Sequence, residues 1–208
     1  MLIARQKRSE NIAEYLLYMF QVEDLIRAYE FNLDQIIDHY VRPQLPDASF
    51  IEQYRDWYKS LIKSMKAERI EKQGHLHDLK DILVEISYLH NTLLNLLKDE
   101  KYAGLYAAAE PIIEEFKQRS NLKDKNNIEV AFQALYMKLL LRLQKKEISA
   151  ESEHAFDTMR ILLAYIAVKY REMQNGELNT SGTNWFFIFL SFFPIQILNE
   201  LLFFRKLK

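Results

Sequence analysis

Glycine and proline are scarce in this chain, and its apolar residues recur at helical spacing. The 208 residues include four glycines and four prolines. Propellers and glycine-rich phosphate loops need more glycine than that. In most segments the apolar residues recur every three or four positions, as they do on one face of a helix. The sequence therefore predicts an all-α fold, a single multi-helix bundle of about six to seven helices with a hydrophobic C-terminal tail.

Capping residues and helix breakers mark where the expected helices begin and end. Two serines, Ser9 and Ser49, are expected to cap helices over about 10–30 and from 50 onward. A short helix is expected from Asn32 to about 41, and longer ones over about 77–98 and 101–119, the last with Pro111 as a kink or a new start. Two more helices are expected, one capped by Asn126 that runs to about 146 and one capped by Ser149 that stops at Gly176. Residues 12–29 and 132–143 are apolar nearly all round, so we expect these two helices at the centre.

The composition changes sharply near the C-terminus. Residues 1–176 are expected to form the helical bundle domain, residues 177–184 a polar linker, and residues 185–208 a hydrophobic tail. The stretch 185–204 is 20 residues long and could cross a bilayer, although Pro194 and Glu200 interrupt it. Three interpretations of the tail stay open: a membrane or interfacial anchor, a helix docked on the bundle, and an altered reading frame. The last is suggested by the tail's many residues that A/T-rich codons encode.

Charge balance and residue usage exclude several functions. The net charge is −1, which argues against a nucleic-acid partner. The chain has no cysteine, so disulfides, cysteine-based zinc sites and thiol nucleophiles are ruled out. The first residues contain no apolar run of signal-peptide length. We therefore expect a cytoplasmic protein, with membrane contact only if the 185–204 tail is genuine.

Histidines and acids in two places resemble metal-binding spacing. Glu151 and His154 form a Glu-x-x-His pattern, but a di-iron bundle needs a second copy and two further glutamates. His75 and His77 precede a helix and are typical of a polar loop. We expect no metal and no other cofactor.

Aromatic side chains gather on two expected helices. Tyr15, Tyr18 and Tyr29 share one side of the first helix, and Tyr54, Trp57 and Tyr58 share one face of the third. An aromatic core explains this pattern, and a ligand pocket or dimer interface is the alternative.

Four polar residues occupy positions where the helical spacing predicts apolar side chains. Glu23 lies within the apolar stripe of the first helix, and Arg27 follows one turn later. His90 lies within the stripe of the fourth helix, and Arg142 lies at the edge of the apolar face of the sixth. Because a buried charge must be paired, we predict that Glu23 pairs with Arg27, Arg142 or both, with His90 nearby. This cluster is either a structural network that fixes helix register or a small site for an anionic ligand or proton transfer.

Several stretches resemble a family of uncharacterised bacterial helical proteins that is classed as a domain of unknown function. They are residues 1–28, the tripeptide Gly74-His75-Leu76, and the segments 134–144 and 146–149. The resemblance covers about residues 1–176 and implies an all-helical fold and a cytoplasmic bacterial protein. It implies no activity and no site residues.

The sequence does not reveal a specific biochemical function. A non-catalytic helical interaction or scaffold domain, with a protein partner or as a homodimer, fits the absence of catalytic motifs. The alternative is a ligand-binding or catalytic helical domain that uses Glu23, Arg27, His90 and Arg142.

Overall fold

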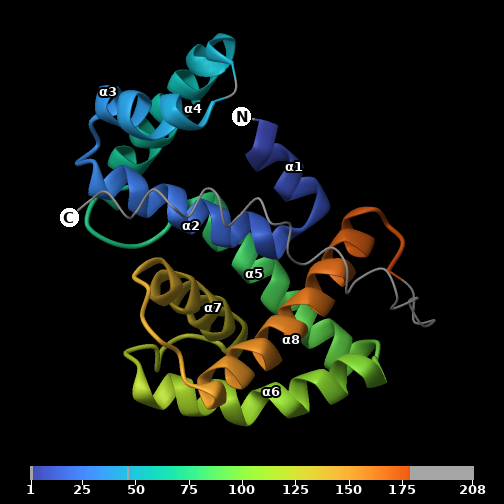
Figure 1. Ribbon diagram of the computed structural model, residues 1–208. Helices are drawn as coiled ribbons and strands as arrows, with labels where there is room; N and C mark the ends of the chain where they lie inside the picture. The colour runs from blue at the N-terminus through green and yellow to red at the C-terminus, as the bar shows by residue number, and fades with distance from the viewer. Residues whose placement is uncertain (1, 46, 179–208) are drawn as a thin grey trace. The chain divides into compact units, whose positions relative to one another are not determined.

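The computed structural model describes residues 2–45 and 47–178 (Figure 1). Every regular element among these residues is helical, so the predicted all-α class is confirmed. The described residues form two compact units. The first contains the residues up to Ser9 and Glu14–Ile82, and the second contains Glu10–Ala13 and the described residues from Leu83 onward. The predicted tail, and the linker from residue 179, lie outside the described residues.

The chain begins with two helices, whereas the sequence predicted a single helix over about residues 10–30. Helix α1 spans Leu2–Glu10 and α2 spans Ile12–Ala28. The side chain of Asn11 accepts a hydrogen bond from the backbone N–H of Ala13 at 3.0 Å, as asparagine does at a helix start. The predicted cap at Ser9 is therefore wrong, because its hydroxyl donates back to the carbonyl of Gln6.

Short turns connect α2 to the next long helix. Asn32 caps α3 (Leu33–Gln35) as predicted, and its side chain accepts from the N–H of Gln35 at 3.1 Å. Elements η1 (Ile36–Val41), η2 (Arg42–Gln44) and η3 (Ala48–Phe50) lead into α4 (Ile51–Ala67). The predicted cap at Ser49 is wrong, because the carboxylate of Asp47 accepts from the N–H of Ser49 at 2.8 Å and starts the η3 turn earlier.

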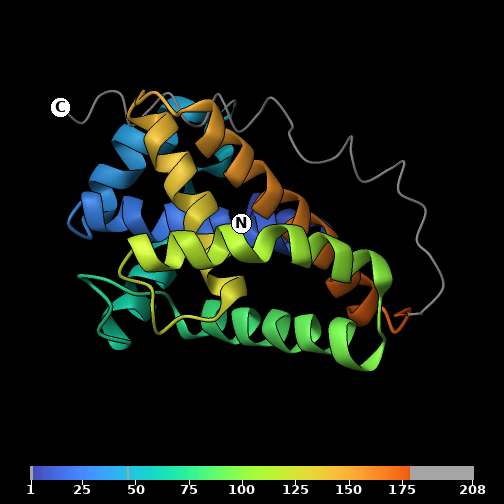
Figure 2. The same ribbon diagram turned by 90° about the horizontal axis from the view of Figure 1, so that it is seen from below.

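The second unit takes in α5 (His77–Asn91) from Leu83, then η4 (Thr92–Leu96), α6 (Glu100–Arg119), α7 (Asn127–Leu143) and α8 (Ala150–Gln174). Helices α6, α7 and α8 pack against one another (Figure 2). The predicted caps Asn126 and Ser149 are both confirmed by bonds from backbone N–H groups. Helix α8 ends just before Gly176, whose φ of 72° is the left-handed conformation that favours glycine.

Helix α6 continues through Pro111 as one helix. The proline removes the N–H that would bond to the carbonyl of Ala107. Both residues are exposed, so water can solvate that carbonyl. A new helix start at Pro111, one of the two predicted outcomes, is therefore wrong.

The cores depend on α8 as much as on the two helices predicted to be central. Helix α2 buries Leu16, Phe20 and Ile26 completely. The second half of α7 is more open than predicted, since Met137 is 43% exposed. Six consecutive residues of α8, from Leu162 to Ala167, are buried. Among the described residues, no helix combines the length and hydropathy needed to cross a bilayer.

Shortening Leu162 to alanine should therefore test the role of α8 in the core. Deleting a fully buried leucine side chain removes apolar burial and leaves a cavity, so Leu162→Ala should lower the free energy of unfolding by about 2–5 kcal/mol. The control Met137→Ala should change it by about 0.5 kcal/mol or less. Urea titration monitored by circular dichroism measures both, and equal losses would contradict this account of the core.

Candidate functional site

A buried carboxylate on α2 lies at the centre of the first unit's polar contacts. Glu23 is completely buried, as its place in the apolar stripe predicted. One carboxylate oxygen lies 2.6 Å from Nδ1 of His75, and the other accepts the backbone N–H of Leu76 at 2.8 Å. The imidazole of His75 stacks on Phe20 with ring centroids 3.8 Å apart. The loop that precedes α5 is thereby fixed to α2.

Arg27, one turn further along α2, binds the same loop through its backbone. Its guanidinium donates to the carbonyls of Ile70 and Gly74, and it forms an ion pair with Asp24 at 2.7 Å. Gly74 has a φ of 95°, so the loop reaches Arg27 through a left-handed turn that favours glycine. The two ends of the loop are thus held by neighbouring turns of one helix.

The predicted pairing of Glu23 with Arg27 is wrong. Each finds its partners in the loop between α4 and α5, and within the described residues the two side chains do not pair. The i,i+4 spacing put both on one side of α2, but sequence spacing carries no information about which loop packs there. The sequence analysis identified Gly74-His75-Leu76 only through the family resemblance, and it considered His75 only as a possible metal ligand or a polar loop residue.

His90 belongs to a network of tyrosines in the second unit. Its Nδ1 lies 2.6 Å from the hydroxyl of Tyr102, and its ring meets that of Tyr106 edge-on at 4.6 Å. Burial lowers the pKa of His90 and raises the pKa of Tyr102. Both directions keep the proton on the tyrosine, so Tyr102 donates to a neutral His90.

The network continues through residues that the sequence analysis missed. The rings of Tyr102 and Tyr165 stack at 5.8 Å, and Tyr165 donates to Asp99 at 2.7 Å. Asp99 also caps α6 by accepting the N–H of Tyr102 at 3.0 Å. Lys169 is 2% exposed and lies 3.0 Å from Glu172 and 4.0 Å from Asp99. The sequence signal that could have identified this part of the network is Lys169, a lysine one turn from Tyr165 among apolar residues of the same helix.

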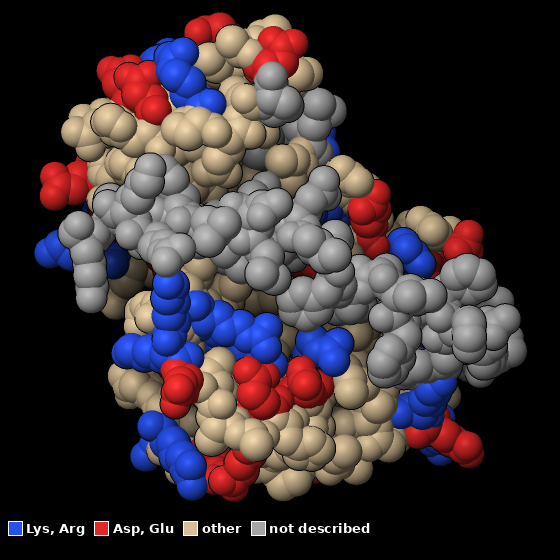
Figure 3. All heavy atoms as spheres, viewed as in Figure 1, with Lys and Arg blue, Asp and Glu red and all other residues tan. Residues whose placement is uncertain are grey.

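Arg142 pairs with α8 and belongs to an ion-pair group at the α7–α8 contact. Its guanidinium lies 3.2 Å from Glu153. The buried Lys138 lies 2.6 Å from Glu153 and 3.2 Å from Asp157. Hydrogen bonds from Lys138 and then Arg142 lower the pKa of the Glu153 carboxyl. Acidic and basic side chains are intermixed in this way over the face of the second unit in Figure 3.

The four predicted site residues therefore belong to three separate groups of contacts. Glu23 and Arg27 hold one loop in the first unit, His90 belongs to the tyrosine network, and Arg142 belongs to the α7–α8 ion pairs. Among residues 2–45 and 47–178, no three His, Asp or Glu side chains are grouped so that they could hold a metal ion.

The contacts define an all-helical protein whose buried charges lie beside charged or hydrogen-bonding neighbours. The chain belongs to the family described as Domain of unknown function (DUF4924), whose model matches residues 1–177. The resemblance noted for about residues 1–176 is thereby confirmed. No curated protein and no solved structure matches the chain.

The tyrosine network predicts a specific pH dependence of stability. Burial lowers the pKa of His90 in the folded state, so near and below the ordinary pKa of 6.5 the unfolded state binds more protons. Stability should fall as the pH drops through about 6.5, and His90→Gln should remove part of that fall. Urea titrations between about pH 7.5 and 5 measure it. An unchanged slope in His90→Gln would refute the assignment.

Proposed function

We propose that this chain is a non-catalytic helical interaction domain that acts in the cytoplasm on protein partners. One observation carries the proposal: the charged side chains buried among the described residues bind groups that hold helices and loops together. A catalytic acid, base or nucleophile needs an atom within reach of its substrate. Both oxygens of Glu23 are already bound to the loop before α5.

The two buried lysines support the same proposal. Lys138 lies between two acids of α8, and Lys169 lies beside Glu172 and Asp99. A buried cation with acidic neighbours is expected in a structural ion pair, because an uncompensated one would cost several kcal/mol. The balanced net charge of −1 favours protein over nucleic acid as the partner, and the absence of cysteine fits a reducing compartment.

One contact favours a second candidate, a small site for proton transfer or an anionic ligand. A carboxylate 2.6 Å from an imidazole nitrogen is the arrangement that orients a catalytic histidine. The side chain of His75 is 21% exposed, so solvent reaches part of it. In this candidate Glu23 would orient His75, with Arg27 close by on the same helix.

Glu23→Gln separates the two candidates. If Glu23 is structural, the amide replaces a charged acceptor with a weaker one, and the free energy of unfolding should drop by about 1–3 kcal/mol. Thermal and urea unfolding of the full chain at pH 7.5 measure this. If Glu23 serves a reaction or ligand, the variant should be as stable as the parent or more so, because functional groups often cost stability.

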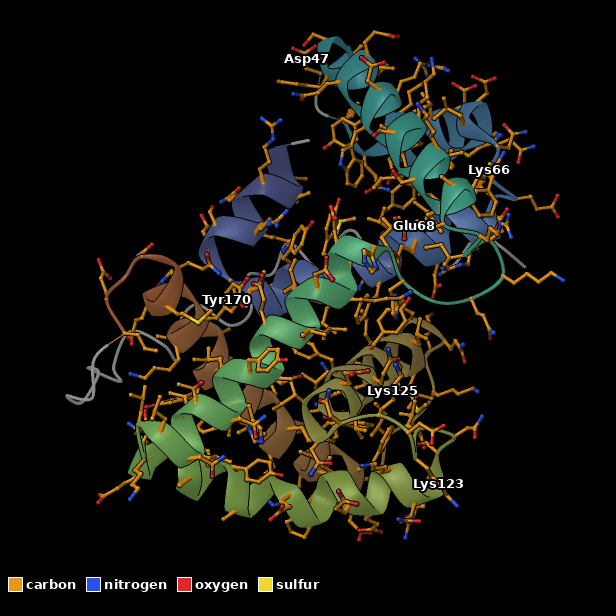
Figure 4. All side chains as sticks on the ribbon, turned by 180° about the vertical axis from the view of Figure 1, so that it is seen from behind. Asp47, Lys66, Glu68, Lys123, Lys125 and Tyr170 are labelled. Carbon is orange, nitrogen blue, oxygen red and sulfur yellow. The ribbon has the colours of Figure 1, made fainter. Side chains whose placement is uncertain are left out.

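Glu68→Gln is the matched control for that experiment. Glu68 lies just after α4 (Figure 4), and its carboxylate accepts the N–H of His77 at 2.7 Å on the same loop. It is exposed, so water replaces any lost bond and the change should be within about 0.5 kcal/mol. Equal stability of the Glu23→Gln variant and the parent, with an intact control, would overturn the interaction-domain proposal.

A further inference from the structure

Helix α1 contributes little apolar surface to the core of the protein. Among residues 3–10, Ala4 alone is buried, whereas Arg5, Gln6 and residues 8–10 are exposed. A helix of nine residues is too short to be stable without tertiary contacts. The position of α1 therefore depends on the side chains that bind it to α2.

Two basic side chains of α1 lie on two tyrosines of α2. The Nζ atom of Lys7 lies 3.4 Å from the carboxylate of Glu14 and 5.9 Å from the centre of the Tyr18 ring. The guanidinium of Arg8 lies 5.5 Å from the centre of the Tyr15 ring. A cation over an aromatic face is attracted by the negative potential of the ring. Glu14, Tyr15 and Tyr18, which we call the tyrosine face, thus bind a segment that carries two adjacent bases.

The two helices meet at a sharp angle, separated by the single residue Asn11 (Figure 1). The side chain of Asn11 caps the start of α2. No glycine or proline enforces the break, because the chain has neither before residue 43. Residues 2–28 can therefore also form one straight helix. Lys7 and Glu14 would then be about 10 Å apart along the helix axis, and α1 would leave the tyrosine face.

We propose that two copies of this chain exchange α1, so that α1 of each copy binds the tyrosine face of the other. The proposal rests on the interaction function above and names a second copy as the partner. Each copy carries a straight helix over residues 2–28, and the contacts of α1 with the tyrosine face are kept. The tyrosine face selects this occupant because it already fits α1 within one chain. Exchange of an identical element forms a dimer without a new interface.

The contacts are placed so that two antiparallel copies make them at once. Arg8 and Tyr15 lie three and four residues from Asn11, and Lys7 and Glu14 lie four and three residues from it. A two-fold axis near Asn11 therefore brings each base opposite the side chain that it contacts within a single chain. Helical hydrogen bonds gained across Asn11 offset the capping bond that is lost.

Two variants with opposite charge changes test the exchange by sedimentation equilibrium of the full chain between about 1 and 500 μM. The parent should pass from monomer to dimer. Lys7→Glu and Glu14→Lys should each dimerise about tenfold more weakly, because like charges then meet wherever α1 binds. An equal mixture of the two variants should dimerise more tightly than the parent, because each α1 then finds its opposite charge only on the other chain.

Two controls accompany the mixture. A chain that carries both Lys7→Glu and Glu14→Lys satisfies the ion pair within itself, so it should dimerise as the parent does. Arg5→Glu makes the same charge change as Lys7→Glu at an exposed residue of α1, and it should also leave the dimer unchanged.

Substitutions of Asn11 provide a second, independent test. Asn11→Ala removes the capping bond that favours the break, so it should strengthen the dimer by about tenfold, since two such bonds are lost per dimer. Asn11→Asp retains a capping side chain and should dimerise as the parent does. Circular dichroism checks that each variant is folded.

Two results would overturn the exchange. The first is a mixture that dimerises no more tightly than the parent, because an ordinary interface would recover only the affinity of the parent. The second is a parent and an Asn11→Ala variant that both stay monomeric up to about 500 μM. Either result leaves the interaction function standing, because that function is tested separately by the stability of Glu23→Gln.

Discussion

The fold of the first unit depends on how it compensates one desolvated carboxylate. Glu23 is fully removed from water, and an uncompensated charge in that position would cost about 3–5 kcal/mol. Compensation comes from the loop before α5, through the imidazole of His75 and the N–H of Leu76. The same loop is held by Arg27 through its carbonyl groups. The loop is thus fixed to α2 by two neighbouring turns of that helix.

The second unit satisfies its buried polar groups differently. The stacked rings of Tyr165 and Tyr102 place their hydroxyl groups beside buried polar partners. The hydroxyl of Tyr165 bonds to Asp99, and that of Tyr102 bonds to His90. Asp99 does two things at once, because it also caps α6. Tyrosine suits such a place, since its ring contributes apolar burial and its hydroxyl supplies one hydrogen bond. Lys138 and Arg142 add ion pairs across the α7–α8 contact.

The contacts of the buried charges explain why residue types that also occur in active sites are consistent here with the proposed interaction function. Glutamate beside histidine, and lysine beside tyrosine and aspartate, also occur in active sites. Here the same groups join a loop to a helix, cap a helix or bridge two helices.

Local signals along the chain determined the helices. Asn126 and Ser149 were identified as caps because each side chain binds an N–H only three residues further along, and this needs no tertiary contact. The caps failed where two candidates competed within a few residues, as Asp47 did with Ser49. The burial of Glu23 also followed from helical spacing alone.

The partners of the buried charges were decided only by the tertiary structure. Glu23 and His75 are 52 residues apart, and His90 reaches Tyr102 across a turn whose direction no local pattern specifies. Periodicity tells which face of a helix is buried but not which loop or helix covers it. The sequence by itself therefore determined that Glu23 is buried and must be paired. The packing of the loop between α4 and α5 determined that the partner is His75, because only packing brings distant residues within hydrogen-bond range.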